Sequence, residues 1–163
     1  MPTATYIPLA TITLSSSAAS VNMASIPNTY KDLILVIDPK GLAGNWVQVE
    51  FNNDTSTVIP GVRALGDGST TISQTQNNAF IDAGFFNSGA VGNTILQIMD
   101  YSATDKHKTV LNRWNNNAGS GANYVAMAAF RYPVTTAISS IRVKSNSGNL
   151  ASGTTVNLYG IAG

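Results

Sequence analysis

The chain has 163 residues, of which 44% are apolar and only 10% are charged, with a net charge of +1 and no cysteine. This length and apolar content predict a single domain, residues 1–163, with a core of its own. The balanced charge offers no basic surface for nucleic acid and no polybasic patch for a membrane, and the lack of cysteine excludes disulfides and thiolate metal sites.

The N-terminal segment, Met1–Tyr6, has neither a charged stretch nor an apolar run. We therefore expect no signal peptide, a short N-terminal arm over about residues 1–5, and synthesis as a soluble protein in a cytoplasm. No apolar run approaches the ~18 residues that a membrane-spanning helix needs.

The polar residues are mostly Ser, Thr and Asn, which together with β-branched residues favour sheets over helices. Strands are predicted in the first third of the chain at Tyr6–Leu14, Ser15–Met23, Asp32–Asp38 and Trp46–Phe51. The run Asp32–Asp38 (DLILVID) is the most apolar of these, and its length and flanking turns predict a strand buried on both faces. We expect it to pair with Trp46–Phe51 around the loop Pro39–Asn45. The polar, glycine-containing stretch Asn52–Asn78 predicts a long connection with at most a short strand inside it.

In the rest of the chain, strands are predicted at Ala79–Phe86, Asn93–Tyr101, Thr109–Trp114, Tyr124–Tyr132, Ile138–Ser145 and Thr154–Ile161. Asp105–Lys108 is expected to form a charged hairpin tip, and Asn115–Asn123 a flexible loop. The alternation over Thr154–Ile161 predicts a strand of the core that completes a sheet begun by the first third of the chain. Eight to ten strands with little or no helix predict an all-β protein, an antiparallel β-sandwich.

Five blocks of the sequence together resemble a known structural module. They are SIPNTYKDLILVI (Ser25–Ile37), VEFNND (Val49–Asp54), DYSATDKHKTVL (Asp100–Leu111), ISSIRV (Ile138–Val143) and GTTVNLYGI (Gly153–Ile161). In this order, over nearly the whole chain, they resemble a virion module of tailed phages of marine and freshwater bacteria. The module occurs as a capsid decoration or head-fibre protein and as a terminal domain of tail fibres.

The resemblance implies a jelly-roll-like β-sandwich with a structural role in the phage particle. Because no long N-terminal shaft or attachment domain precedes the blocks, we expect a free-standing capsid decoration (cement) protein that stabilises the head by non-covalent contacts. The alternative is a tail-fibre tip that binds a receptor or carbohydrate. The expected location is the virion, and the expected partners are the major capsid protein or other virion proteins, further copies of the chain in a dimer or trimer, and, as a candidate, a surface glycan. We expect the contacts in Asn52–Asn78 and the N-terminal segment.

The residues offer little for catalysis. His107, the only histidine, lies between two lysines; any Ser–His–Asp triad would have to use it, but a solvated turn is the simpler interpretation. One histidine without cysteine cannot supply an ordinary zinc site. The spacing suggests no carboxylate pair of the kind a glycosidase needs. The acidic residues are Asp32, Asp38, Glu50, Asp54, Asp67, Asp82, Asp100 and Asp105.

Three groups of residues remain as binding candidates. Asn52–Thr55, or Asp67 with its neighbouring glycines, could bind Ca²⁺, although neither matches an EF-hand loop and Asn52 and Asn53 also suit a left-handed turn. The glycines lack the strand–loop–helix context of a phosphate loop: Gly66, Gly68, Gly119 and Gly121. Aromatic side chains could stack on sugars, although core or interface positions are more usual: Tyr6, Tyr30, Trp46, Tyr101, Trp114, Tyr124 and Tyr132. Trp46 and Trp114 lie beside polar loops and are the best of these. We expect no enzymatic activity, catalytic residue, bound metal or cofactor.

Overall fold

The computed structural model describes residues 4–41, 45–86, 91–117 and 123–163. Within these ranges there are twelve strands and no helix, so the prediction of an all-β sandwich is confirmed. The strands are β1 (Tyr6–Thr13), β2 (Ser20–Met23), β3 (Asp32–Asp38), β4 (Asn45–Phe51), β5 (Ile59–Gly66), β6 (Thr71–Asn78), β7 (Ile81–Phe86), β8 (Val91–Met99), β9 (Lys108–Asn117), β10 (Val125–Tyr132), β11 (Ile141–Ser145) and β12 (Thr155–Ile161). None of the described segments is a helix long and apolar enough to cross a membrane.

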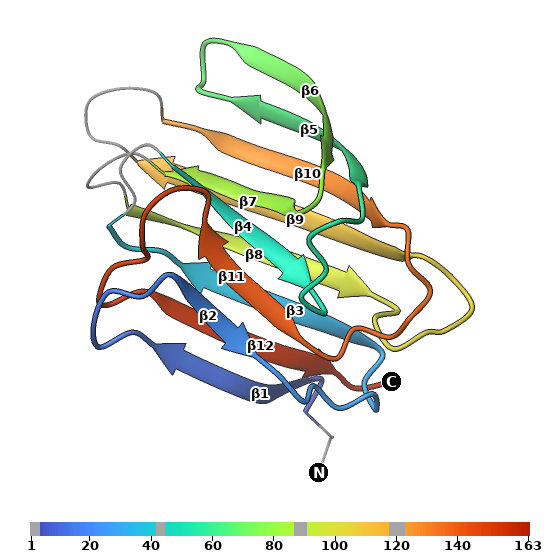
Figure 1. Ribbon diagram of the computed structural model, residues 1–163. Helices are drawn as coiled ribbons and strands as arrows, with labels where there is room; N and C mark the ends of the chain where they lie inside the picture. Colours follow the sequence, from blue (N-terminus) through green and yellow to red (C-terminus); the bar gives the residue numbers. More distant parts are fainter. Residues whose placement is uncertain (1–3, 42–44, 87–90, 118–122) are drawn as a thin grey trace.

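The strands form two antiparallel sheets of unequal size. The large sheet has eight strands in the order β1-β12-β3-β8-β9-β10-β5-β6, and the small sheet has four in the order β2-β11-β4-β7. Figure 1 shows the small sheet lying across one face of the large one. From β1 to β4 the chain alternates between the sheets, whereas the pairs β5–β6 and β9–β10 both stay in the large sheet.

Strict alternation of apolar residues builds the core between the sheets. On β3 the side chains of Leu33, Leu35 and Ile37 are fully buried, and Val47 and Val49 on β4 are equally buried. Successive side chains of a strand point to opposite faces, so each of these strands contributes every second residue to the core.

β12, the last strand in the sequence, lies inside the large sheet and not at its edge. β12 pairs with β1 on one side and with β3 on the other, and Leu158 lies opposite both Ala10 and Leu35. A Cβ atom on Gly160 would come within 2.4 Å of the ring of Tyr30, so only glycine leaves room for that ring. β12 therefore joins the first strand of the chain to the most apolar one.

Two expectations about β3 are wrong. β3 does not pair with β4, because β3 lies between β12 and β8 in the large sheet and β4 lies between β11 and β7 in the small one. The short connection between them crosses from one sheet to the other. β3 is also not buried on both faces, since Ile34 and Val36 are only partly covered where no second layer reaches them.

The chain also has more than the eight to ten strands expected, because Asn52–Asn78 is not a long loop. It contains β5 and β6, which form a hairpin with Leu65 opposite Ile72. β6 reads TISQTQNN and lies at the edge of the large sheet with most of its side chains exposed. An edge strand exposed on both faces needs no apolar alternation, so the pattern that identifies buried strands is absent there.

We expect a chain shortened at Thr155 to lose its cooperative fold, because β1 and β3 would lose their shared partner and the core would lose Val156 and Leu158. Circular dichroism during thermal unfolding would show no transition. Removing only the exposed Gly163 is the control and should leave the transition in place. A shortened chain that stays folded and soluble would contradict the prediction.

Candidate functional site

The face of the large sheet that points away from the small sheet is apolar and uncovered. On β5 and β10 the side chains of Val62 and Met127 are 58% and 67% exposed, and Leu111 on β9 is 42% exposed. The outer face of an antiparallel sheet normally carries polar residues. A contiguous apolar surface of this kind usually marks a binding site.

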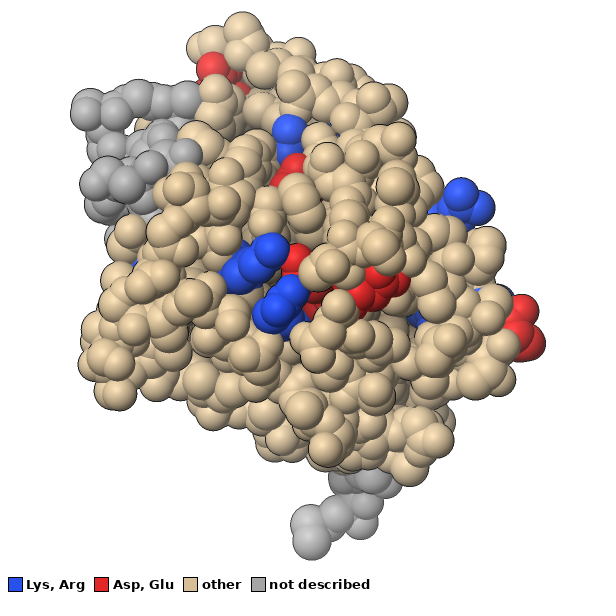
Figure 2. Space-filling model, viewed as in Figure 1, with Lys and Arg blue, Asp and Glu red and all other residues tan. Residues whose placement is uncertain are grey.

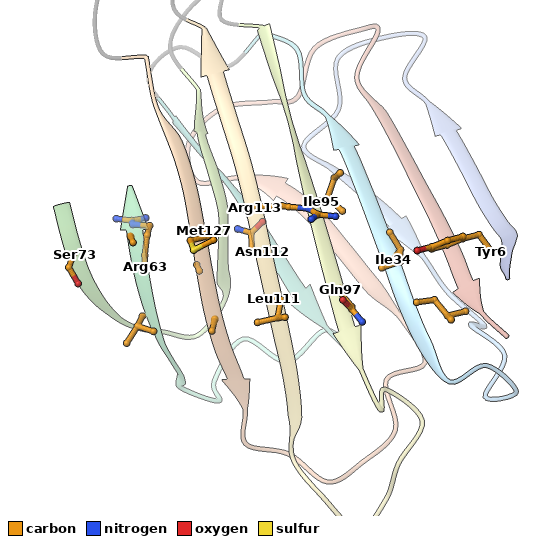
Figure 3. A pocket seen from close by; sticks show the side chains of 15 residues that line it. Tyr6, Ile34, Arg63, Ser73, Ile95, Gln97, Leu111, Asn112, Arg113 and Met127 are labelled. Atoms are coloured by element: carbon orange, nitrogen blue, oxygen red, sulfur yellow. The ribbon is translucent and has the colours of Figure 1, made fainter. Parts of the chain in front are cut away.

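This outer face contains a groove with a volume of about 490 Å³. Figure 3 shows its side chains spread across the large sheet, from Ser73 and Arg63 on one side to Tyr6 on the other. The lining residues are Tyr6, Ile34, Val62, Arg63, Ala64, Ser73, Ile95, Gln97, Leu111, Asn112, Arg113, Met127, Ala128, Ala129 and Ile161. We call this set of residues the outer groove.

The strand register places the groove side chains in two cross-strand rows. One row runs Ile34, Gln97, Leu111, Ala129 and Val62 across β3, β8, β9, β10 and β5. The next row runs Ile95, Arg113, Met127 and Ala64. Neighbouring side chains in such rows lie close enough to form a continuous surface. The groove is therefore a mostly aliphatic surface with two polar side chains, Gln97 and Arg113, near its centre.

The two polar groups differ in their partners. Gln97 Nε2 donates to Asp32 Oδ2 at 3.1 Å, and Asp32 Oδ1 accepts the backbone N–H of Asp100 at 2.9 Å. Arg113 is exposed and forms no ion pair or side-chain hydrogen bond within the described part of the chain. The guanidinium of Arg113 is thus available to a partner.

Arg63 borders the groove, but its side chain extends to the inner face of the sheet. Its Nη1 lies 3.9 Å from Asp82 Oδ2 on β7, and its guanidinium lies 4.2 Å from the ring of Trp46. The Trp46 ring also contacts Phe85 and Trp114, at centroid distances of 5.2 and 5.9 Å. This aromatic cluster joins β5 to the edge of the small sheet and surrounds a second cavity of about 240 Å³.

Burial sets the electrostatics of this cluster. Arg63 is 6% exposed and Asp82 is 7% exposed. Burial raises the pKa of Asp82 to about 6, against the opposing effect of Arg63, and burial lowers the pKa of Arg63. Arg63 Nε and Nη1, and Trp114 Nε1, are enclosed and have no hydrogen-bond partner within the described residues. Because these donors are enclosed, a ligand in the second cavity could not reach them without movement, and we assign the cluster a structural role.

Charges on the small sheet are paired among themselves. Glu50 on β4 is 2% exposed and lies between Arg142 and Lys144 of β11, with Lys144 Nζ 2.7 Å from Glu50 Oε1. Figure 2 shows charged side chains gathered near the middle of this face, in a view that is otherwise mostly uncharged. This network leaves little unpaired charge here to attract a ligand.

The structure does not bring the catalytic candidates together. His107 is exposed, and no group of three or more His, Cys, Asp or Glu residues able to hold a metal occurs among the described residues. The carboxylates of Asp54 and Asp67 are used in their own turns: Asp54 Oδ1 accepts the N–H groups of Ser56 and Thr57, and Asp67 Oδ1 that of Thr70. Both calcium candidates therefore have a local structural explanation.

Asn52 and Asn53 form the turn that their residue type suggests. Their φ angles are 54° and 55°, so the left-handed turn is confirmed. Asn52 Oδ1 accepts the N–H groups of Ser139 and Ser140, at 2.8 and 3.2 Å. Its side chain thus ties the end of β4 to the segment that leads into β11.

The segment Asp105–Lys108 is only in part the expected charged tip. Asp105, Lys106 and His107 are exposed, but Lys108 is fully buried. Its Nζ lies within hydrogen-bond distance of five backbone carbonyls, which share its three N–H groups; they belong to Ala103, Lys106, Val134, Thr135 and Thr136. Burial lowers the pKa of Lys108. The side chain therefore cross-links two loops at one end of the sandwich.

The remaining candidates are mostly unavailable to a ligand. Tyr101, Tyr132 and Trp114 are buried, whereas Tyr6 is 58% exposed and lines the outer groove. The other aromatic candidates, Tyr30, Trp46 and Tyr124, are partly buried. Gly66 is the last residue of β5, and Gly68 lies within the turn of the β5–β6 hairpin. Gly119 and Gly121 lie outside the described residues.

Most of the outer groove has no clear signal in the sequence, and this includes Arg113, Met127 and Val62. One signal was present in β10, which reads VAMAAFRY and is apolar on both faces, with Val125 and Met127 on one and Ala126 and Ala128 on the other. A strand with two apolar faces has either a second covering layer or an external partner.

Comparison with known proteins assigns no family. No protein-family model and no curated protein matches the chain. Among solved structures, a protein named as a candidate pore-forming toxin of Bacteroides vulgatus aligns with 90% of this chain at 6% identity and a TM-score of 0.09, and the chain spans 60% of that protein's length. A similarity this weak supports no conclusion about fold or function.

We expect Asp82 to make the free energy of unfolding fall as the pH rises from about 4 to 6. Its pKa is raised to about 6 in the folded state, so the folded chain keeps a proton that the unfolded chain releases near pH 4. The contribution is complete below pH 4 and is lost above pH 6, at most ~3 kcal/mol. Urea unfolding of the wild type and of Asp82→Asn across this pH range would measure the contribution. If the free energy of unfolding changes with pH equally in the two proteins, the prediction is wrong.

Asp54 provides a control of the opposite sign. Hydrogen bonds from Thr57 and Ser56 hold the pKa of Asp54 well below its usual value. Its stabilising contribution is therefore present above pH 4 and is lost as the pH falls. Asp54→Asn should lower the free energy of unfolding above pH 4 and reduce its fall with acid below pH 4.

Replacing Lys108 with methionine should destabilise the fold by about 3 kcal/mol or more, because a buried apolar side chain would leave several carbonyls without their donor. Lys106→Met is the matched control; the Lys106 side chain is 52% exposed, so the change should stay within about 0.5 kcal/mol. Urea unfolding would compare the two variants, and similar effects of both would show that Lys108 has no special role.

Proposed function

We propose that the chain is a structural virion protein of a tailed phage, a capsid decoration protein that acts by non-covalent contacts and not by catalysis. The observation that carries the proposal is the uncovered outer face of the large sheet, with Val62 58% and Met127 67% exposed. Apolar surface of this extent favours association, since its burial stabilises a complex by roughly 25 cal/mol per Å². The five sequence blocks that resemble the phage module support the same function.

The strand order supports the jelly-roll part of this proposal. Eight of the strands follow the orders β1-β12-β3-β8 and β2-β11-β4-β7, and the chain alternates between these two sets at nearly every step. Two sheets of four strands built in this way are typical of jelly rolls, which are common in viral capsid proteins. In this interpretation β5–β6 and β9–β10 are insertions that extend one sheet beyond the eight-stranded core.

The mechanism would be repeated contact over the capsid surface. A specific interface buries on the order of 1,000 Å² or more, and repetition over the shell makes individually weak contacts effectively permanent. The proposed partners are the major capsid protein or other virion proteins, with further copies of the chain and a surface glycan as additional candidates. The β5–β6 hairpin, within Asn52–Asn78, contributes Val62, Ala64 and Ser73 to the outer groove.

The alternative is a carbohydrate-binding tip of a tail fibre. The observation in its favour is Tyr6, an exposed aromatic side chain in the same groove as Gln97 and Arg113. Against it, Trp114, Tyr101 and Tyr132 are buried and cannot stack on a sugar from solvent. A glycan array with micromolar binding that is lost in Tyr6→Ala would favour the alternative.

We expect the chain to occur in hundreds of copies on the heads of particles of the phage that encodes it. Quantitative mass spectrometry of purified particles, with the major capsid protein as internal standard, would give the copy number, and cryo-electron microscopy would locate the density. A few copies at the tail would support the fibre-tip alternative. Absence of the chain from the particles would refute a virion role.

A further inference from the structure

The outer groove lies where the two added strand pairs join the rest of the large sheet. Leu111, Met127 and Val62 come from β9, β10 and β5, and Ile34 and Ile95 come from β3 and β8. The small sheet does not cover this face, so these side chains contribute little to the core of the chain itself. Their apolar character is explained by a partner on the outside.

The charge of the groove is a single cation. Among the described residues, Arg63 and Arg113 are the only charged ones that line it, and the side chain of Arg63 is directed to Asp82 on the inner face. All eight acidic residues of the sequence lie in the described part of the chain, and none of them pairs with Arg113. Arg113 Cα lies opposite Ile95 on one side and Met127 on the other, so its guanidinium is bordered by aliphatic side chains. Figure 3 shows Arg113 beside Ile95 within the groove.

This charge argues against a second copy of the chain as the occupant. A two-fold interface brings the same patch of both subunits together. Two outer grooves face to face would place two unpaired arginines in one apolar interface, and an uncompensated buried charge costs several kcal/mol. A partner that supplies one carboxylate avoids this cost, because arginine and carboxylate form strong bidentate hydrogen bonds.

The openness of the groove argues against a small molecule. Small-molecule sites usually enclose 70–90% of the ligand surface. Here the walls themselves are open, with Tyr6, Val62 and Met127 between 58% and 67% exposed. A polypeptide segment that lies across the strands can cover such a wide, shallow surface.

We propose that the outer groove binds a segment of a partner protein in which aliphatic side chains flank one carboxylate, and that Arg113 pairs with this carboxylate. The partner is a virion protein in so far as the proposed function holds, but the chemistry of the segment does not depend on it. Arg113 sets the orientation of the segment, and Leu111, Val62 and Met127 provide its apolar contacts.

A charge exchange with the purified chain tests the groove directly. The probe is a labelled, end-blocked peptide of alternating leucine and valine around one glutamate, with glutamine and lysine versions as controls, followed by fluorescence anisotropy. We expect the glutamate peptide to bind most tightly, Arg113→Gln to weaken it at least about tenfold, and Arg113→Glu to prefer the lysine peptide. Arg131→Gln is the matched control. Arg131 lies on β10 and is exposed, as Arg113 is, but it does not line the groove.

Several outcomes would overturn the proposal. One is equal binding of the three peptides. Another is no effect of Arg113→Gln on binding, in a variant that melts like the wild type. A third is tighter Arg113-dependent binding of the fatty acid dodecanoate than of the glutamate peptide, which would identify a small molecule as the occupant. Sedimentation that shows a wild-type dimer in which Met127 is protected from peroxide would identify a second copy as the occupant instead.

Oxidation of Met127 in particles separates this inference from the proposed function. Met127 is 67% exposed in the free chain and should be oxidised by peroxide at least about tenfold more slowly in the particle. A chain that is present in particles with Met127 as reactive as in the free protein refutes the docking site and leaves the virion role intact. A chain absent from particles refutes the virion role, and the peptide experiment still decides the groove.

Discussion

The small sheet has half as many strands as the large sheet, so it cannot cover the whole of one face of the large sheet. The four strands of the small sheet cover part of one face of the large sheet, and Leu35 and Leu96 are fully buried on that face. β10 still contacts the small sheet, through Tyr132 and Phe51, but β5 and β6 extend past the edge strand β7. There the aromatic cluster around Trp46 takes the place of a covering sheet. No described element covers the other face, and its aliphatic side chains Val62, Leu111 and Met127 are exposed.

Buried charges tie down the parts that the two sheets do not hold together. Lys108 binds loop carbonyls at one end of the sandwich, and Arg63 connects β5 to β7 at its side. Both side chains are almost completely buried, so each is costly unless it is compensated by hydrogen bonds or an opposite charge. Lys108 is compensated well, by five carbonyls. Arg63 is compensated less well, through Asp82, Gln74 and the face of Trp46. Burial raises the pKa of Asp82 in spite of the opposite effect of Arg63.

The sequence predicts the core strands well because burial leaves a period of two, as in Leu33, Leu35 and Ile37. Pairing is harder to predict, since a short connection such as that between β3 and β4 can either turn back as a hairpin or cross to the opposite sheet. β6 escapes prediction because its polar side chains are exposed on both faces. The outer groove escapes it for a different reason: the exposure of Met127 depends on which strands are covered, and that is a property of the assembled sheets.

The position of β12 has a consequence for synthesis. Its neighbours β1 and β3 are made early, but they do not pair with each other, and the strand that separates them leaves the ribosome long after both. Until β12 has been made, β1 lacks its one pairing strand among the described residues and one edge of β3 stays open, so the large sheet cannot close before then. Open strand edges are prone to pair with other chains. The insertion of β12 between β1 and β3 is therefore a late folding step, and the chain is most exposed to aggregation before it takes place.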